Sequence, residues 1–292
     1  MLSNSALLKK IVVYGALMKP RVNRAFSLSW ATLIGLFIAS QGIPPLIDSI
    51  KAVVAVFTIA AGIYIYNDIT DIELDRINHS DRPLATGKVS KNEAATLVLI
   101  LSVTGIIMSI LINLETLLLS LIFLGLGFAY SNHYIRLKKR FIIKQLVPAI
   151  GGIISSLVGG TTIGFISGKL IFASLMFFVL IFVGAPILDI KDFRGDKKYE
   201  CKTFAIVFGP TITVKMSMLT LISLGLITLI IHPLIGFSYV TGVLVSVLCF
   251  AFALAISPLL KFWQDPLLCE KTIKRMILLH LLIQISFLIE SI

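Results

Sequence analysis

The sequence predicts an all-α integral membrane protein with about nine transmembrane helices in a single domain spanning residues 1–292. Its composition is 57% hydrophobic and only 14% charged, whereas a soluble chain carries about 25% charged residues. The apolar residues form blocks of roughly twenty, which is the length that crosses the hydrocarbon core of a bilayer. The basic residues lie between these blocks and recur in alternate loops.

Nine apolar stretches are long enough to span a membrane. A short segment before them, LLKKIVVYGALMKP at 7–20, is amphipathic and is expected to lie at the membrane interface. The expected spans are 23–42, 47–69, 92–112, 115–135, 142–166, 170–188, 211–231, 235–260 and 272–290.

The placement of Lys and Arg predicts the orientation of the chain. Of the 26 such residues, all except Lys51, Lys169 and Lys215 precede the first span, begin it, or follow spans 2, 4, 6 and 8. The positive-inside rule therefore predicts a cytoplasmic N-terminus and a C-terminus on the outside. It also explains the net charge of +11 as loop charge facing lipid headgroups, so we expect no nucleic-acid partner.

The cysteines and the small residues have no predicted chemistry. The three cysteines show no CxxC or Cys/His spacing, which argues against a disulfide framework or a zinc site. The small residues of GGIISSLVGG, at 151–160, are typical of close packing between transmembrane helices.

A first group of polar residues stands where the second span ends. Asn67, Asp71 and Asp75 are spaced i, i+4, i+8, which places them on one helix face, and Asp68 lies beside them. Three carboxylates at a helix C-terminus oppose the helix dipole and repel one another. A positive partner is therefore expected here.

A second acidic group follows the sixth span, on the same predicted side of the membrane. Asp189, Asp192 and Asp196 are spaced i, i+3, i+7 and share a helix face if the helix continues that far. Acidic residues near a membrane are costly and usually mark a site. A simpler interpretation is a solvated face, or ion pairs with neighbouring lysines and arginines.

Oxygen-only ligands suit a hard cation. Mg²⁺ prefers one or two carboxylates, waters and substrate phosphates. Two such sites facing each other would hold a diphosphate, with Arg82, Lys191 and Arg194 neutralising the remaining charge. Asn23 could also reach the cavity. The alternative is that it belongs to a basic anchor at the membrane interface. Lys138, Lys139 and Arg140 are interpreted as orientation charges.

These motifs resemble those of the UbiA family of intramembrane prenyltransferases. NDITDIELD at 67–75 is similar to the family's NDxxDxxxD, and DIKDFRGD at 189–196 to its DxxDxxxD. DRPLATGKVS at 81–90, YSNHYIRLKKR at 130–140 and KTFAIVFG at 202–209 also fit the family. The resemblance covers essentially the whole chain.

The resemblance implies helices around a central cavity that opens to the cytoplasm, with loops 70–91 and 189–210 carrying the motifs. It implies that two Mg²⁺ ions bind an allylic prenyl diphosphate and that the prenyl group passes to a lipophilic acceptor in the bilayer. Asp71, Asp192 and Lys191 would be central to catalysis, Lys191 and Arg82 would touch the diphosphate, and Tyr130 and Ser131 would line the pocket. The residues matching the metal-binding motifs are Asn67, Asp68, Asp71, Asp75, Asp189, Asp192 and Asp196.

The acceptor and the reaction class leave alternatives. The motif segments look more like the branch that prenylates glyceryl-lipid or chlorophyll-type acceptors than the branch that prenylates haem. A glyceryl lipid such as geranylgeranylglyceryl phosphate is the expected acceptor, and an aromatic quinone precursor is the main alternative. A terpene cyclase would use the same cation chemistry without an acceptor. An ion-coupled transporter would need acidic residues near the bilayer midplane, and the predicted mid-spans lack them.

Overall fold

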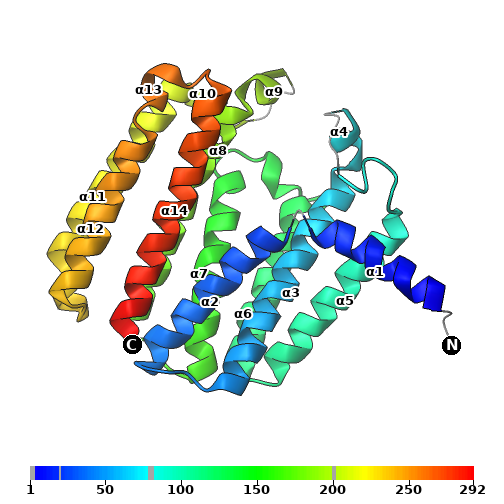
Figure 1. Ribbon diagram of the computed structural model, residues 1–292, viewed down its shortest axis with the longest axis horizontal. Coiled ribbons are helices and arrows are strands. Elements are labelled where there is room, and N and C mark those ends of the chain that lie inside the picture. The colour runs from blue at the N-terminus through cyan, green and yellow to red at the C-terminus, as the bar shows by residue number, and fades with distance from the viewer. Residues whose placement is uncertain (1–3, 20, 78–81, 199–201) are drawn as a thin grey trace.

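The prediction of an all-helical membrane protein is confirmed. The computed structural model describes residues 4–19, 21–77, 82–198 and 202–292, and within them every regular element is helical. Nine of these helices are long and apolar enough to cross a membrane, as Figure 1 shows. They are α2 (Val22–Ser40), α3 (Leu46–Thr70), α5 (Lys91–Ile110), α6 (Leu114–Ser131), α7 (Ile143–Ile163), α8 (Gly168–Lys191), α11 (Pro210–Ile235), α12 (Tyr239–Ile256) and α14 (Pro266–Ser291).

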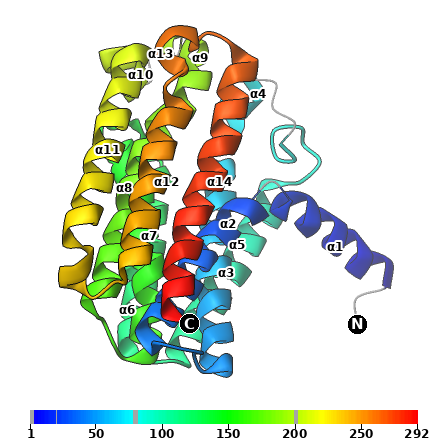
Figure 2. The same ribbon diagram turned by 60° about the vertical axis from the view of Figure 1, so that its left-hand side comes forward.

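The short helices gather mainly at one end of the bundle. Figure 1 shows α4, α9, α10 and α13 there, with the C-terminus at the opposite end. Helix α1 contacts α3 and α5 and then runs away from the bundle in both ribbon views (Figures 1 and 2). The short elements are α1 (Asn4–Met18), α4 (Ile72–Ile77), η1 (Leu137–Lys139), α9 (Phe193–Lys198), α10 (Phe204–Phe208) and α13 (Leu259–Phe262).

Helices α2 and α7 cross at very close range, as the small residues of 151–160 predict. A side chain at Gly159 would place its Cβ 2.4 Å from the backbone oxygen of Thr32, and one at Gly35 would place it 2.1 Å from the oxygen of Ser156. The Thr32 hydroxyl also donates a hydrogen bond of 2.8 Å to the Ser155 carbonyl oxygen. Small residues allow this approach because membrane helices associate through packing and hydrogen bonds.

The largest boundary difference is at the last span, which begins at Pro266 rather than at 272. The Asp265 carboxylate caps this helix by accepting hydrogen bonds from the backbone N–H groups of Leu267 and Leu268. Proline suits the first helical position. The first turns of α14 carry charged residues and therefore lie outside the apolar stretch of this helix.

The C-terminal end of α14 is attached to its neighbours by one carboxylate. Glu290 accepts hydrogen bonds from the hydroxyls of Ser238 and Thr241, both at 2.6 Å, and pairs with Lys169 at 3.2 Å. Through these contacts Glu290 accepts hydrogen bonds from two hydroxyls at the start of α12 and joins α12 to α8 and α14. This end of the bundle is opposite the acidic motifs.

The α2–α7 crossing generates a stability prediction. We expect Gly159→Leu to destabilise the purified protein by about 1–3 kcal/mol, because overpacking forces the backbones apart. Thermal unfolding in detergent measures this as a Tm several degrees lower. Gly125→Leu in α6 is the matched control, since its Cβ would meet nothing within 4 Å. Equal Tm values for the two variants would contradict the close crossing.

Candidate functional site

Both acidic motifs stand where a long helix breaks. Asp71 ends α3 with φ −108° and ψ 9°, and Asp192 ends α8 with φ −95° and ψ 9°. Each is followed by a six-residue helix, α4 or α9, which carries the last aspartate of its motif. The expectation of one continuous helix through Asp75 was therefore wrong, since α3 stops at Thr70.

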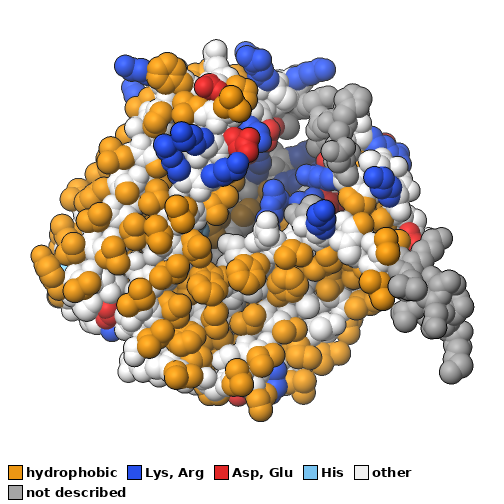
Figure 3. Space-filling model, in the orientation of Figure 1, with side chains coloured by type: hydrophobic (Ala, Val, Ile, Leu, Met, Phe, Trp, Pro, Cys, Tyr) orange, Lys and Arg blue, Asp and Glu red, His pale blue; other side chains and the backbone are white. Residues whose placement is uncertain are grey.

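The two motifs surround one space. Figure 3 shows a hollow with Lys, Arg, Asp and Glu side chains around it, above a surface covered by hydrophobic side chains. Lys138 contacts Asp71 of the first motif at 2.7 Å, and Lys144 contacts Asp189 of the second at 2.9 Å. The Tyr130 hydroxyl donates to the Lys144 carbonyl oxygen at 3.4 Å. Residues far apart in the sequence therefore meet at this end of the bundle.

Arginines hold two aspartates of the first motif. Arg21 forms a buried ion pair with Asp68, including a hydrogen bond of 2.8 Å from its Nε. Arg82 lies 2.5 Å from Asp75 and 3.3 Å from Asp68, so it bridges the two carboxylates. Burial raises the pKa of the Asp75 carboxyl above its ordinary value, while the Arg82 guanidinium opposes that rise.

The other two residues of this motif surround a lysine. Lys138 Nζ lies 2.7 Å from both carboxylate oxygens of Asp71 and 3.0 Å from Asn67 Oδ1. Ser131 donates to the same Asn67 oxygen at 2.8 Å, and Asn67 Nδ2 donates to Asp71 at 3.2 Å. Burial lowers the pKa of Lys138 even though Asp71 favours its charged form.

The second motif is more open. The Asp189 carboxylate accepts hydrogen bonds from Lys144 Nζ at 2.9 Å and from Gln145 Nε2 at 3.0 Å. Asp196 is half-buried on α9. The remaining predicted residues of this motif are exposed, namely Lys191, Asp192 and Arg194.

Lys191 lies on a different side from Asp189. It lies within electrostatic range of Cys269 and Glu270 at the start of α14. Asp192, in contrast, is close enough to Asp189 for the two negative charges to repel each other. The structure thus brings Asp192 and Asp189 together and leaves Lys191 at the α14 edge of the site.

The geometry fits a hard cation at the first motif, although the aspartates do not form a ready-made acidic cluster. Among the described residues no three Asp, Glu, His or Cys side chains gather as metal ligands. Asn67 and Asp71 nevertheless direct three oxygens at a single ammonium group, and Thr70 Oγ1 is 3.3 Å from it. An all-oxygen set that already surrounds one cation has the chemistry of a Mg²⁺ site.

Four residues at the site were not among the predicted ligands. Lys138 was interpreted as an orientation charge, and Lys144, Gln145 and Arg24 were not singled out for the site. Arg24, beside the exposed Asn23, lies over the Tyr64 ring with 5.9 Å between its Cζ and the ring centre. The sequence signal for Lys138 was the basic run that follows the YS pair, and this run resembles the basic loops after other spans.

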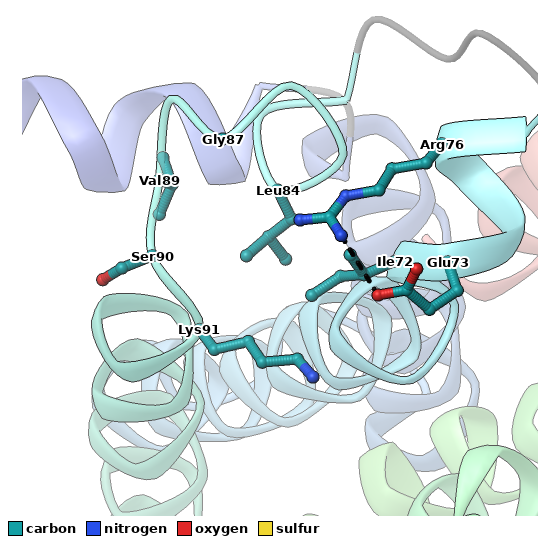
Figure 4. A pocket seen from close by; sticks show the side chains of 8 residues that line it. All are labelled: Ile72, Glu73, Arg76, Leu84, Gly87, Val89, Ser90 and Lys91. Carbon is teal, nitrogen blue, oxygen red and sulfur yellow. Dashed lines mark hydrogen bonds and ion pairs between the residues drawn. The ribbon is translucent and has the colours of Figure 1, made fainter.

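A separate pocket of about 350 Å³ lies beside α4. Figure 4 shows the Glu73 and Arg76 side chains of α4 paired with each other beside it, and Lys91 at the start of α5. None of the motif aspartates lines it, so it is distinct from the site above. Its lining residues are Ile72, Glu73, Arg76, Leu84, Gly87, Val89, Ser90 and Lys91.

Comparisons with known sequences match most of the chain, including both acidic motifs. The model of the UbiA prenyltransferase family matches residues 28–277. Digeranylgeranylglyceryl phosphate synthase of Sulfurisphaera tokodaii is 30% identical over 77% of this chain and 81% of its own length. The same-named protein of Saccharolobus solfataricus is 30% identical over 80% of this chain and 82% of its own.

Solved structures share the fold. A structure described as giving insights into digeranylgeranylglyceryl phosphate synthase in membranes matches with a TM-score of 0.78 and 25% identity, covering 97% of this chain and 98% of that one. A UbiA homologue from Archaeoglobus fulgidus, bound to GPP and Mg²⁺, matches with a TM-score of 0.70 and 19% identity, covering 94% and 99%. Together, the motifs, the nine spans and these matches show that the chain belongs to the UbiA prenyltransferase family, whose members are multi-pass membrane enzymes that transfer prenyl groups.

Proposed function

We propose that this prenyltransferase uses Mg²⁺ to transfer a prenyl group from an allylic diphosphate to geranylgeranylglyceryl phosphate or a closely similar glyceryl lipid. The observation that carries the proposal is the meeting of both motifs around one hollow rich in cationic side chains, with Lys138 on Asp71 and Lys144 on Asp189. The names of the matched relatives support the acceptor. The whole chain, 1–292, is proposed to act as one domain.

Two Mg²⁺ ions are proposed, one for each motif. Asn67, Asp68, Asp71 and Asp75 would serve the first ion, and Asp189, Asp192 and Asp196 the second. When bound, the metal supplies charge neutralisation to the departing diphosphate. Asp71 and Asp192 are the central candidates because each lies where its helix breaks.

The remaining side chains are proposed to position the substrate. Arg82 holds Asp68 and Asp75 while its side chain stays 34% exposed, so its guanidinium can also meet a phosphate oxygen. Tyr130 and Ser131 lie on the last turns of α6 beside Asn67, and Asn23 stands at the start of α2. Arg194 and Lys191 would contribute positive charge from the rim.

The diphosphate is a poor leaving group in water, and the site offers what its departure needs. Fixed cations near the developing charge stabilise it without reorganisation, and shielding from water protects the allylic cation until the acceptor captures it. The apolar helices below the hollow suit a long isoprenoid tail, whose burial contributes roughly 0.8 kcal/mol per CH₂ group.

Arg24 is proposed to bind the acceptor's phosphate. In the described part of the chain no carboxylate pairs with it, whereas Arg21 and Arg82 each have an aspartate. Its guanidinium lies over the ring of Tyr64, which stands on α3 just before the first motif. A phosphorylated acceptor needs such an additional cation, and an uncharged one does not.

The site is proposed to open to the cytoplasm, with the N-terminus on that side and the C-terminus outside. Both motifs lie at one end of the bundle, opposite the C-terminus (Figure 1). Loops 70–91 and 189–210 carry the motifs, although residues 78–81 and 199–201 lie outside the described part.

We expect Asp71→Asn and Asp192→Asn each to lower Mg²⁺-dependent diphosphate release at least about a hundredfold, because each removes charge from a proposed metal ligand. Purified protein in detergent, supplied with geranylgeranyl diphosphate and acceptor, provides the measurement. Asp48→Asn is the control, because Asp48 pairs with Lys51 in the first turns of α3, at the end opposite its motif. Normal turnover in both motif variants would refute the two-motif site.

We expect Arg24→Leu to raise KM for geranylgeranylglyceryl phosphate about tenfold, or about 1.4 kcal/mol, while KM for the prenyl diphosphate changes little. Arg76→Leu is the matched control, because Arg76 is exposed and pairs with Glu73 away from the hollow. The same assay with an aromatic acceptor, or with none, distinguishes a quinone-precursor enzyme and a cyclase by their products. An equal rise in both KM values would contradict the assignment of Arg24.

A further inference from the structure

One segment of the chain reaches both motifs. Residues 136–145, which follow α6 and run into the first turn of α7, place Lys138 on Asp71 at 2.7 Å and Lys144 on Asp189 at 2.9 Å. Arg136 is also 3.7 Å from Asp71. We call this segment the basic strap. Lys138 and Asp71 are 67 positions apart in the sequence, and Lys144 and Asp189 are 45 positions apart.

The backbone of the basic strap is held in an unfavourable conformation at both ends. Arg136 has φ 43° and Ile142 has φ 68°, and a β-branched residue in the left-handed region is a genuine outlier. Such conformations persist where the surroundings fix them, and they cluster at functional sites. Here Arg136 and Lys138 pair with Asp71 and Lys144 pairs with Asp189, and these ion pairs hold the strap between the two motifs.

The position of Lys138 is that of a bound cation. Its side chain is only 13% exposed, and its ammonium group contacts Asp71 Oδ1 and Oδ2, Asn67 Oδ1 and Thr70 Oγ1. These include the oxygens proposed for the first Mg²⁺ ion. An ammonium and a divalent ion cannot occupy the same oxygens, because their charges repel at contact distance.

We infer that Lys138 is a tethered cation that occupies the first metal site until Mg²⁺ and the diphosphate arrive together. The inference rests on the proposed function and adds an order of binding to it. Mg²⁺ alone must displace a buried ammonium and leave it without a counter-ion. A diphosphate supplies that counter-ion, so each ligand raises the affinity for the other.

Metal binding without turnover tests this inference. The probe is Mn²⁺, followed by electron paramagnetic resonance on the full chain in detergent, with and without geranyl thiolodiphosphate, a non-ionising diphosphate. For the wild type we expect Mn²⁺ affinity to rise at least tenfold when the thiolodiphosphate is present. For Lys138→Met we expect Mn²⁺ alone to bind about tenfold more tightly than in the wild type, with a coupling of less than threefold.

Two variants separate this role from a structural one. Lys139→Met is the matched control, since Lys139 is the exposed neighbour in the same turn, and it should keep the wild-type coupling. Lys138→Arg retains the tethered charge and should also retain the coupling. Where Lys138→Met lowers the yield of folded protein, Lys138→Gln removes the same charge and serves for the same comparison.

The outcomes are distinct for the inference and for the proposed function. Mn²⁺ alone binding to Lys138→Met no more tightly than to the wild type would overturn the inference, while Mn²⁺ binding with diphosphate in the wild type would leave the proposed function intact. No Mn²⁺ binding to the wild type, with or without diphosphate, would overturn the proposed function and the inference together.

Discussion

The site depends on the need to balance carboxylates at one end of an apolar helix bundle. Buried negative charges are costly unless an opposite charge faces them. The chain meets this need with Arg21 on Asp68, Arg82 on Asp75, Lys138 on Asp71 and Lys144 on Asp189. These cations come from the start of α2, the loop after α4, and the segment that follows α6 and runs into the first turn of α7. Charge balance therefore holds distant parts of the chain around one hollow.

The ion pairs of the motif aspartates also bear on the proposed chemistry. Each motif aspartate that faces a side-chain cation in this protein is also a proposed ligand for a metal ion during the reaction. The breaks at Asp71 and Asp192, with nearly equal backbone angles, turn the last part of each motif away from its long helix. A continuous helix would carry Asp75 and Asp196 straight on along the helix axis, out of the bundle.

The opposite end of the protein serves stability instead. Glu290 binds Ser238, Thr241 and Lys169, and the close α2–α7 crossing at Gly35 and Gly159 sets the distance between two helices that border the site. Because the end of the bundle opposite the motifs is closely packed, the loops at the site can carry strained residues such as Ile142. This division follows the general rule that functional residues stand on loops positioned by a packed scaffold.

The sequence by itself determined the number of apolar spans and placed both motifs at one end of the bundle, because apolar run length and charge placement are local properties. From residue type it predicted the class of ligand. It also identified Asn67, Asp71, Asp189 and Asp192 as candidates. The tertiary structure alone decided which cation meets which aspartate, why Lys191 faces α14, and where the helices break. Those facts depend on contacts such as Lys138 with Asp71, 67 positions apart, which no local pattern records.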